Sequence, residues 1–321
     1  MLRNRADGRT LAFVAFYYVL LAVEWRFAFT PYGVGGWMIA PLVVLTCMIS
    51  WICAVITHNT LHCPVFKNRT ANKFFQVALT CAYGFPVSEY VPGHNLSHHK
   101  FTQKRADLMR TSKVQYGWNL VNFFAFFPRV GFDIFGENYR YVGMMKVKMP
   151  KWYRQLMIEM VMCWGTKAVL LALDWKKALV FVVIPHFFAV WGITTVNYLQ
   201  HDGCDEDDRF NHSRNFMGRI FNWFTFNNGF HGIHHEHPGL HWSKLREAHM
   251  KELHEGIHPA LEQPSLALYM FRTFVYPGKR MRYDGQPVKL PMEGPDEEWI
   301  PKNIQSAVHE LGAEGTALDA G

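Results

Sequence analysis

The segment that decides the fold is Gly36–His62, with the sequence GWMIAPLVVLTCMISWICAVITHNTLH. Up to Thr57 it contains no Asp, Glu, Lys or Arg, and about 20 consecutive apolar residues are enough for a helix to span the hydrocarbon core of a bilayer. The segment ends with His58 and His62, which are four residues apart and would share one face of a helix. It therefore predicts a membrane-spanning helix that presents two imidazoles at one end.

Three other segments are apolar enough to span a membrane: Leu11–Phe29, Leu156–Leu173 and Ala178–Leu199. The last has no charged residue, whereas the first contains Glu24 and Arg26 near its end. Leu156–Leu173 is the weakest of the four because Glu159 and Lys167 lie inside it, and a surface helix is the alternative there. Charged residues within spans are costly and usually face the interior of the helix bundle. The sequence thus predicts an all-α integral membrane protein with four transmembrane helices.

The connections between the spans predict two hairpins. Residues 30–35 join the first two spans and residues 174–177 join the last two, so both chain ends and the long middle stretch lie on one side of the membrane. Of the 33 Lys and Arg residues, 29 lie on that side, which the positive-inside rule identifies as the cytoplasm. The basic N-terminus precedes an apolar run without an evident cleavage site, so we expect a retained first span. We favour a bacterial inner membrane over the endoplasmic reticulum.

The rest of the chain predicts a helical cytoplasmic cap, formed by residues 58–155 and 200–302. We expect the cap and the spans to form one domain over residues 1–302. The tail over residues 303–321 is rich in Gly and Ala and is expected to be disordered.

Three shorter apolar stretches lie within the cap. Phe74–Pro92 is interrupted by Pro86, and Trp118–Phe135 is interrupted by Pro128 and by two charged residues that follow it. Both are predicted to be interfacial or re-entrant helices. Ser265–Pro277 has a similar composition, and we expect the same of it.

Composition narrows the partners of the protein. The 321 residues carry a formal charge of +7 and 16% are aromatic, a bias that suits a lipid interface. The charge permits anionic partners such as phospholipid surfaces or an acidic electron donor. No nucleic-acid recognition motif accompanies it, so nucleic acid is not expected as a partner. The six cysteines contain no CxxC pair, which indicates free thiols in a reducing compartment.

Nine of the 17 histidines fall into four short groups, one of which includes an asparagine: His58/His62, His94/His98/His99, Asn197/His201 and His231/His234/His235. Within each group, residues three or four apart share a face of a helix. Two groups end the second and fourth spans, and the other two lie in the predicted cap. Topology therefore brings all four groups to the cytoplasmic side of the membrane.

Nine clustered imidazoles exceed the four to six ligands of one metal ion and suit two ions. Neutral imidazole offers a nitrogen lone pair and binds Zn, Cu, Fe and Ni, so the ligand type alone does not identify the metal. The alternative is a set of surface histidines that bind no metal.

The other histidines are not grouped in this way. His212, His237 and His241 lie near the groups and are expected to be hydrogen-bond partners of ligands. Four more are expected on the surface: His249, His254, His258 and His309. His186 lies within the fourth span, where a structural role beside Pro185 is favoured over a place in a substrate cavity.

The combined motif resembles the membrane fatty acid desaturase/hydroxylase superfamily, whose histidine boxes read HxxxH or HxxxxH, HxxHH or HxxxHH, and HxxHH. All three boxes occur here in that order, and the resemblance covers His58 to Trp242. Asn197 and His201 are similar to the Asn/His pair of stearoyl-CoA desaturases, in which the asparagine approaches its metal through water. The resemblance implies that Asn197 lies behind the metal ligands, where His212 is also expected from its position near the groups.

What the resemblance implies for the fold is a four-helix membrane stem beneath a cytoplasmic cap that holds a di-metal site. It implies two non-haem iron ions bound by nine ligands: His58, His62, His94, His98, His99, His201, His231, His234 and His235. The assignment of each histidine to one of the two ions stays open. No catalytic residue is implied beyond these ligands.

The activity implied by the resemblance is O2-dependent oxidation of an unactivated C–H bond in a fatty acyl or lipid chain. No cytochrome b5 domain with an HPGG motif is present, so a separate ferredoxin, rubredoxin or cytochrome b5-type protein is expected to donate electrons. Desaturation is the first interpretation. The alternative is hydroxylation as a monooxygenase, or decarboxylation to a terminal alkene, because the boxes do not separate these outcomes. The sequence Asn197-Tyr198-x-x-His201 followed by His212-Ser213-x-Asn215 is also similar to membrane alkane hydroxylases.

Other classes of protein match the sequence poorly. A zinc hydrolase would use a motif such as HExxH, which is absent. A haem cytochrome would need paired histidines within the membrane, where only His186 is predicted. A metal transporter would place ligands along a permeation path, whereas these histidines lie at the cytoplasmic ends of the spans.

Overall fold

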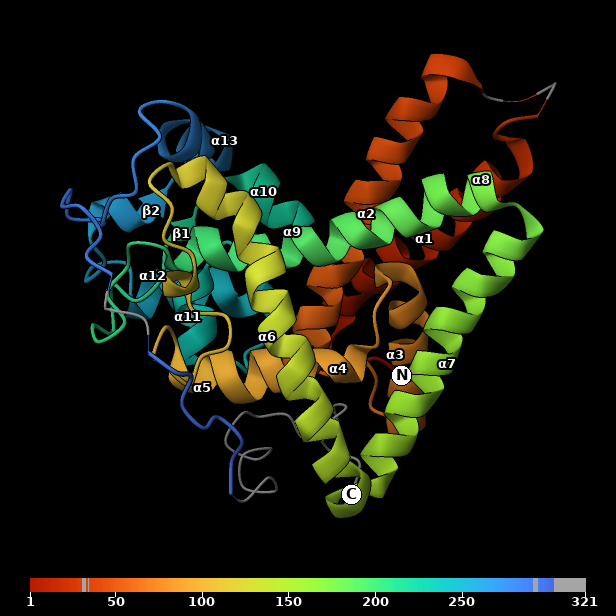
Figure 1. Cartoon of the computed structure of the whole chain (residues 1–321), viewed down its shortest axis with the longest axis horizontal. Coiled ribbons are helices and arrows are strands. Elements are labelled where there is room, and N and C mark those ends of the chain that lie inside the picture. The colour runs from red at the N-terminus through yellow and green to blue at the C-terminus, as the bar shows by residue number, and fades with distance from the viewer. Residues whose placement is uncertain (31–32, 34, 291–293, 303–321) are drawn as a thin grey trace. The chain divides into compact units, whose positions relative to one another are not determined.

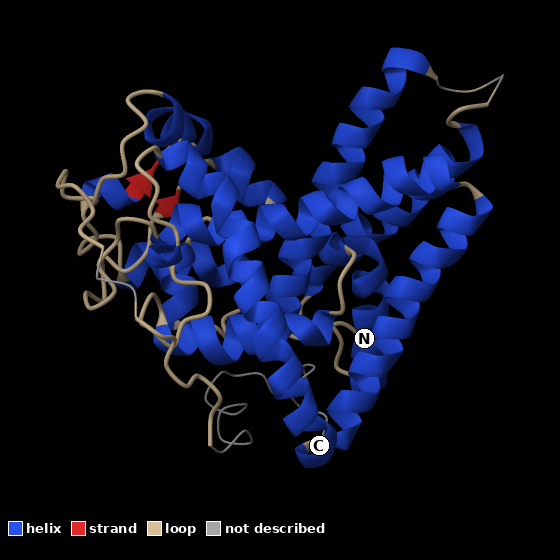
Figure 2. Cartoon of the chain, viewed as in Figure 1, coloured by secondary structure: helices blue, strands red, loops and turns tan. Residues whose placement is uncertain are grey.

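The computed structural model describes residues 1–30, 33, 35–290 and 294–302, so the predicted disordered tail lies outside the described residues. The described chain is mostly helical with two very short strands, which agrees with the all-α part of the predicted fold class (Figure 2). It divides into two compact units, which are described separately below. Among the described residues, unit 1 consists of residues 1–90 and 145–193, and unit 2 consists of residues 91–144 and 194–302.

Unit 1 contains the long apolar helices. Its elements are α1 (Gly8–Phe27), α2 (Ile39–His62), α3 (Arg69–Tyr83), α7 (Pro150–Leu173), α8 (Trp175–Ala178), the π-helical turn Leu179–Val183, and the first part of α9 (Ile184–His201). Four helical stretches are long and apolar enough to cross a membrane: Arg5–Phe27, Gly36–His62, Pro150–Leu173 and Trp175–His201. They coincide with the four predicted spans, and the first ends two residues earlier than predicted because the backbone is extended at Ala28.

The charged residues that made the third span the weakest have defined partners in unit 1. Helix α3 ends at Gly84, whose φ of +95° is the left-handed conformation that favours glycine. Helix α7 lies against α3 (Figure 1), and the Lys167 ammonium donates to the carbonyl of Gly84 at 2.6 Å. One helical turn earlier, the Cys163 thiol donates to the same carbonyl at 3.2 Å.

Glu159 is the counterpart of Lys167 on α7. Its Oε2 accepts a hydrogen bond of 2.8 Å from the backbone N–H of Ser88 in α4 (Val87–Val91), and its Oε1 accepts one of 2.9 Å from Gln155. The Glu159 carboxyl group thus accepts from a backbone N–H at the start of α4, and the Lys167 ammonium donates to a backbone carbonyl at the end of α3. The break between α3 and α4, which contains Pro86, is therefore stabilised by α7 side chains at four-residue intervals, Glu159, Cys163 and Lys167.

Two other polar pairs are buried in unit 1. The Tyr17 hydroxyl lies 2.8 Å from Nε2 of His186, and Thr46 donates to Oε1 of Glu24 at 2.5 Å. A Cβ atom at Gly84 would lie 2.3 Å from the His186 side chain. These contacts favour the structural role for His186.

Unit 2 begins with the π-helical turn Pro92–His98 (η3) and α5 (His99–Phe101), followed by α6 (Asn119–Lys148), most of which belongs to this unit. Its later elements are α10 (Arg219–Phe224), α11 (His231–Glu236), α12 (Leu245–Glu252) and α13 (Leu266–Met270). Strands β1 (Asn215–Phe216) and β2 (Glu262–Gln263) pair in parallel. The predicted helix in Ser265–Pro277 is confirmed as α13 and the π-helical turn after it.

The predicted helix in the stretch Trp118–Phe135 is part of α6, which continues through Pro128 as a single 30-residue helix. A proline ring fixes a helical φ and removes one N–H donor, which bends a helix more often than it ends it when the flanking turns are packed. Here Phe126 and Val130 on either side of the proline are fully buried.

The segment after α13 is held to unit 2 by ion pairs. The Arg280 guanidinium pairs with Asp202, just after α9, at 2.5 Å, and donates to the carbonyls of Thr111 and Val114. Asp296 pairs with Lys113, whose side chain is only 1% exposed. These contacts fix the loop that follows α5, and this loop contacts one of the histidines described next.

Candidate metal centre

The second histidine box lies on a π-helical turn, and this winding decides where its side chains lie. In η3 the backbone N–H of His99 donates to the carbonyl of His94, five residues earlier. His94 and His99 therefore lie together, with their Nε2 atoms 3.1 Å apart. The sequence-based expectation that His94 and His98 act as one pair assumed an α-helix. In the structure their ligand atoms belong to different clusters.

The third box divides its histidines in a similar way. On α11, His231 and His235 are one turn apart and their Nε2 atoms lie 3.1 Å from each other. His234 lies on a different face of the helix, with its ring centroid 4.8 Å from that of His99. The end of α9 adds His201, whose Nε2 is 2.9 Å from Nε2 of His231.

Unit 2 thus contains two histidine clusters, which we call cluster A and cluster B. Cluster A consists of His94, His99 and His234, and cluster B consists of His98, His201, His231 and His235. Within each cluster, one ligand nitrogen from every residue lies within 4.8 Å of the others. Over the described residues of this unit, both clusters consist of histidine alone.

The first box belongs to unit 1. His58 and His62 lie at the end of α2, both are buried, and their ring centroids are 5.6 Å apart. Their ligand nitrogens lie within 4.8 Å of each other. The structure therefore keeps this HxxxH pair together, as expected for residues one turn apart on an α-helix.

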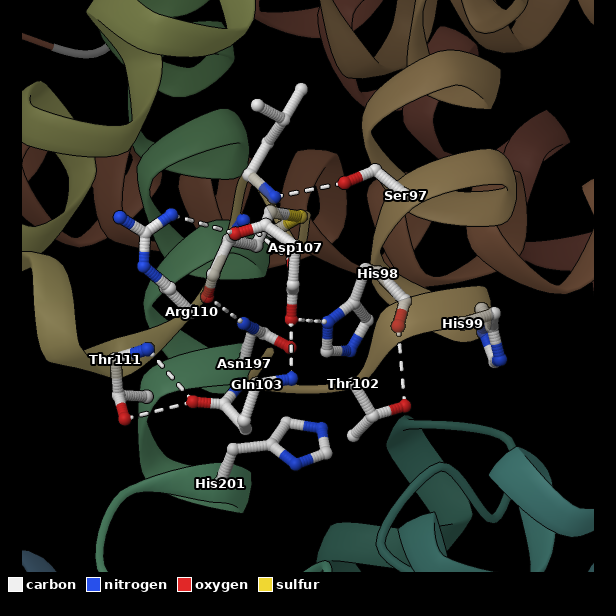
Figure 3. A network of polar contacts seen from close by, with 12 residues as sticks. Ser97, His98, His99, Thr102, Gln103, Asp107, Arg110, Thr111, Asn197 and His201 are labelled. Carbon is white, nitrogen blue, oxygen red and sulfur yellow. Dashed lines mark hydrogen bonds and ion pairs between the residues drawn. The ribbon is translucent and has the colours of Figure 1, made fainter. Parts of the chain in front are cut away.

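The surroundings of His98 test whether cluster B suits a metal ion. Nδ1 of this fully buried imidazole lies 2.9 Å from Oδ2 of Asp107 (Figure 3). Nε2 is also buried and has no hydrogen-bond partner among the described residues. A carboxylate on one nitrogen fixes the proton there and leaves the other lone pair to a metal, which is the usual arrangement of metal-bound histidine. The orphaned Nε2 is costly without a ligand, so cluster B suits a metal ion.

Asp107 is itself held in place by backbone donors. The N–H groups of Gln103 (Figure 3) and Met109 donate to its carboxylate at 2.8 and 2.7 Å. Burial alone would raise the pKa of this carboxyl, but the His98 imidazole and the two N–H donors hold the pKa below its usual value. Asp107 is therefore ionised and bonded on both oxygens. The sequence analysis did not identify it, because a single Asp nine residues after a histidine has no distinctive spacing.

The nitrogen-to-nitrogen distances in cluster B also suit a metal ion. The Nε2 atoms of His201, His231 and His235 form a chain with separations of 2.9 and 3.1 Å. Nδ1 of His201 lies 3.1 Å from the carbonyl of His212, which leaves Nε2 of His201 with its lone pair. A metal about 2.0–2.1 Å from each imidazole nitrogen brings neighbouring nitrogens to such separations. Burial lowers the pKa of His235 well below its usual value, and the neighbouring His99 and His231 lower it further, so this imidazole is neutral.

Comparison with known proteins agrees with the motif. Residues 35–263 match the sequence profile described as fatty acid desaturase. The chain belongs to the fatty acid desaturase family. It is also similar to an alkane 1-monooxygenase from Ectopseudomonas oleovorans, with 36% identity over 89 residues, which is 25% of this chain and 22% of that protein. The similarity thus spans about a fifth of the monooxygenase. Together with family membership, the four apolar helices indicate an integral membrane protein.

In this desaturase-family protein, Asn197 and His212 lie beside cluster B. Nδ2 of Asn197 donates to the carbonyl of Met109 at 3.0 Å, in the segment that also donates to Asp107. Nδ1 of His212 lies 2.8 Å from the carbonyl of Arg209, and its ring centroid is 5.7 Å from that of His235. His212 contacts His201 through the backbone carbonyl of His212.

The remaining histidines have mixed outcomes. His254 and His258 are exposed, as predicted, whereas the prediction of a surface position for His249 was wrong because its side chain is fully buried. His237 pairs with Glu252 at 2.7 Å, and His241 contacts Ser243. Neither of these two contacts involves a cluster histidine. His309 lies outside the described residues.

Proposed function

We propose that the protein is an O2-dependent di-iron oxidoreductase that oxidises an unactivated C–H bond of a fatty acyl or related lipid chain. The observation that carries the proposal is the division of the box histidines of unit 2 into two nitrogen-only clusters. Each cluster contains histidines from both the second and the third box. Two groups of imidazoles suit two ions of a metal that accepts nitrogen ligands.

The ligand count supports a role for the first box. Cluster B has four imidazoles, whereas cluster A has three within unit 2. A transition-metal ion that is anchored by nitrogen ligands takes at least four ligands in a closed site. His58 and His62 are the remaining pair of adjacent, buried box histidines. We infer that they complete the ligands of the cluster A ion, which gives nine histidines for two ions.

The residues of the chain have separate tasks in this proposal. Nine imidazoles hold the ions without adding negative charge, and Asp107 keeps His98 in the tautomer that presents Nε2. The Asn197 side chain donates to the carbonyl of Met109, and the Asp107 carboxylate accepts from its N–H. These two bonds attach the loop after α5 to α9 and fix the position of Asp107. When bound, the iron ions supply the reactivity towards O2 and the C–H bond. A separate ferredoxin, rubredoxin or cytochrome b5-type protein supplies electrons.

Desaturation of the lipid chain is the first proposal for the product, in line with the family. Hydroxylation is the second, because one observation favours it: part of the chain is similar to an alkane 1-monooxygenase. Decarboxylation to a terminal alkene belongs with this second group. The outcome depends on which substrate carbons lie nearest to the metal, and displacements of about 1 Å change rates strongly.

The arrangement in the membrane is part of the proposal. The two short connections support two hairpins, and the distribution of Lys and Arg supports a cytoplasmic position for the cap, in a bacterial inner membrane. Labelling single cysteines introduced at Arg5 and Trp175 with a membrane-impermeant maleimide in intact cells tests this. Labelling at position 175 but not at position 5 is expected, and the reverse pattern contradicts the topology.

The central experiment is expression in a bacterial host with compatible ferredoxin and reductase, followed by lipid analysis by mass spectrometry and iron analysis of the purified protein. We expect two metal ions per chain and an oxidised product, either an alkene or an alcohol. His98→Ala is the matched inactive control because it removes one ligand from a fully buried position. A folded, active sample with one metal ion or none would contradict the proposal.

A further inference from the structure

A third group of metal-ligating side chains lies outside clusters A and B. It consists of His249 on α12, His254 just after that helix, and Glu262 on β2, and all three belong to unit 2. One ligand atom from each of them lies within 4.8 Å of the others. None of the three is part of a histidine box, so the proposed di-iron site does not use them.

The local fold brings these side chains together. At the end of α12 the N–H groups of Leu253 and His254 both donate to the carbonyl of His249, at 3.1 and 3.0 Å. This tight turn returns His254 towards His249, and their ring centroids are 6.2 Å apart. Strand β2 then places Glu262 between them. Nε2 of His249 and Nδ1 of His254 both lie 2.8 Å from the same carboxylate oxygen, Oε1.

The group is closed on one side and open on the other. The side chain of His249 is fully buried, that of Glu262 is 15% exposed, and that of His254 is 42% exposed. Within the described ranges, the ion-pairing partners of Glu262 within 4.0 Å are these two imidazoles, and no Lys or Arg is among them. The negative charge of the carboxylate is therefore not already neutralised by a fixed cation.

We propose that His249, His254 and Glu262 bind one divalent metal ion of the zinc class. Two imidazoles and one carboxylate are an established ligand set for zinc, with water in the fourth position. The exposed edge at His254 gives water access to that position. Small rotations of the three side chains bring their ligand atoms to about 2.0–2.2 Å from a common centre, because these atoms already surround one point.

The ion has a structural task at this position. It links the end of α12 to β2, and β2 pairs with β1 at Asn215. The Asn215 side chain accepts a hydrogen bond of 3.0 Å from the N–H of Gly232 in α11. Since α11 carries His231, His234 and His235, the ion stabilises the platform of the third histidine box without contacting it.

The test is zinc binding by the full-length purified protein, measured as metal content after dialysis and as competition with a chromophoric chelator. The variants are His254→Ala, whose side chain is partly exposed, and Glu262→Gln. The matched control is His237→Ala, because His237 is also an exposed histidine 2.7 Å from a carboxylate, Glu252, but belongs to no group of three metal-ligating side chains over residues 1–30, 33, 35–290 and 294–302. Clusters A and B contribute equally to all four proteins and cancel in the comparison.

We expect the wild type and His237→Ala to bind one more equivalent of zinc than His254→Ala and Glu262→Gln, or to bind that equivalent at least tenfold more tightly. Zinc should also raise the Tm of the first two proteins more than that of the last two. Glu262→Gln keeps an oxygen that accepts from both imidazoles, so a purely hydrogen-bonded arrangement would survive in it. Equal zinc content and equal Tm shifts in the wild type and His254→Ala would overturn the proposal. Loss of the two iron equivalents from every protein would instead contradict the proposed function.

Discussion

Glu159 in unit 1 and His98 in unit 2 are both fully buried ionisable residues, but their hydrogen bonding differs. Both oxygens of Glu159 accept hydrogen bonds, from Ser88 and Gln155. Only one nitrogen of His98 is bonded, to Asp107, and the other has no partner among the residues that the structure describes. A buried polar group with all its bonds made serves the fold. One that keeps an unused lone pair beside other imidazoles indicates a ligand site.

The same contrast separates two irregular stretches of helix, the break between α3 and α4 and the π-helical turn η3. Between α3 and α4 the backbone groups that the break leaves without helical partners are bonded by side chains of α7. In η3 the π-helical winding keeps the backbone bonded and changes which side chains share a face. Single π turns within helices are frequent at functional sites. The comparison predicts that substitutions in α7 affect stability and that substitutions in the clusters affect metal binding.

The largest effect is expected for removal of a cluster B ligand. His98→Ala should abolish turnover and reduce the metal content, because a metal ion loses a direct bond that no neighbouring side chain can replace. The protein should remain inserted in the membrane, since the spans are built from other residues. Iron analysis, product analysis and membrane fractionation measure these three outcomes. An active His98→Ala protein with full metal content would refute the assignment of cluster B.

The second effect concerns the carboxylate that orients His98. Asp107→Asn keeps the size of the side chain but removes the charge, and the loss of such an outer partner typically costs about 10–100-fold in metal affinity or activity. We expect a loss in this range, smaller than that of His98→Ala. Asp133→Asn is a useful control, because Asp133 pairs with Lys113 and not with a histidine. Equal activity of Asp107→Asn and the wild type would show that His98 needs no fixed partner.

The third effect tests the other side of the comparison. Glu159→Ala leaves the buried N–H of Ser88 without its acceptor, which typically costs about 1–3 kcal/mol of unfolding free energy. Thermal unfolding in detergent should show a lower Tm, whereas metal content per folded chain should stay at the wild-type value. Glu159→Gln keeps one acceptor oxygen, so its Tm should lie between those of the wild type and Glu159→Ala. If Glu159→Ala loses metal without losing stability, then this residue serves the site and the comparison fails.

Sequence patterns predicted the spans and the box histidines because both depend on short spacings. An apolar run of sufficient length forms a span wherever it lies, and His58 and His62 are neighbours on any α-helix. The division into clusters A and B depended on the π-helical register of η3, which no spacing rule signals. Asp107 and Glu262 meet their histidines through loops and a strand pair, so their roles depended on tertiary contacts. The wrong prediction for His249 has the same cause.

The smallest effect is expected for Asn197→Ala, compared with His201→Ala one turn later on α9. His201 contributes a nitrogen to cluster B, whereas the Asn197 amide donates to the carbonyl of Met109. Loss of one such hydrogen bond costs about 0.5–1.5 kcal/mol, and it loosens the segment whose N–H groups hold Asp107. We therefore expect Asn197→Ala to keep both metal ions and to lose part of its turnover, while His201→Ala loses metal and all turnover.

Asn197→Asp tests the direction of the hydrogen bond, because a carboxylate cannot donate to the Met109 carbonyl. If Asn197→Ala loses metal as completely as His201→Ala, then Asn197 is a direct ligand. If its turnover is unchanged, the bond to Met109 serves the fold alone, as the bonds of Glu159 do.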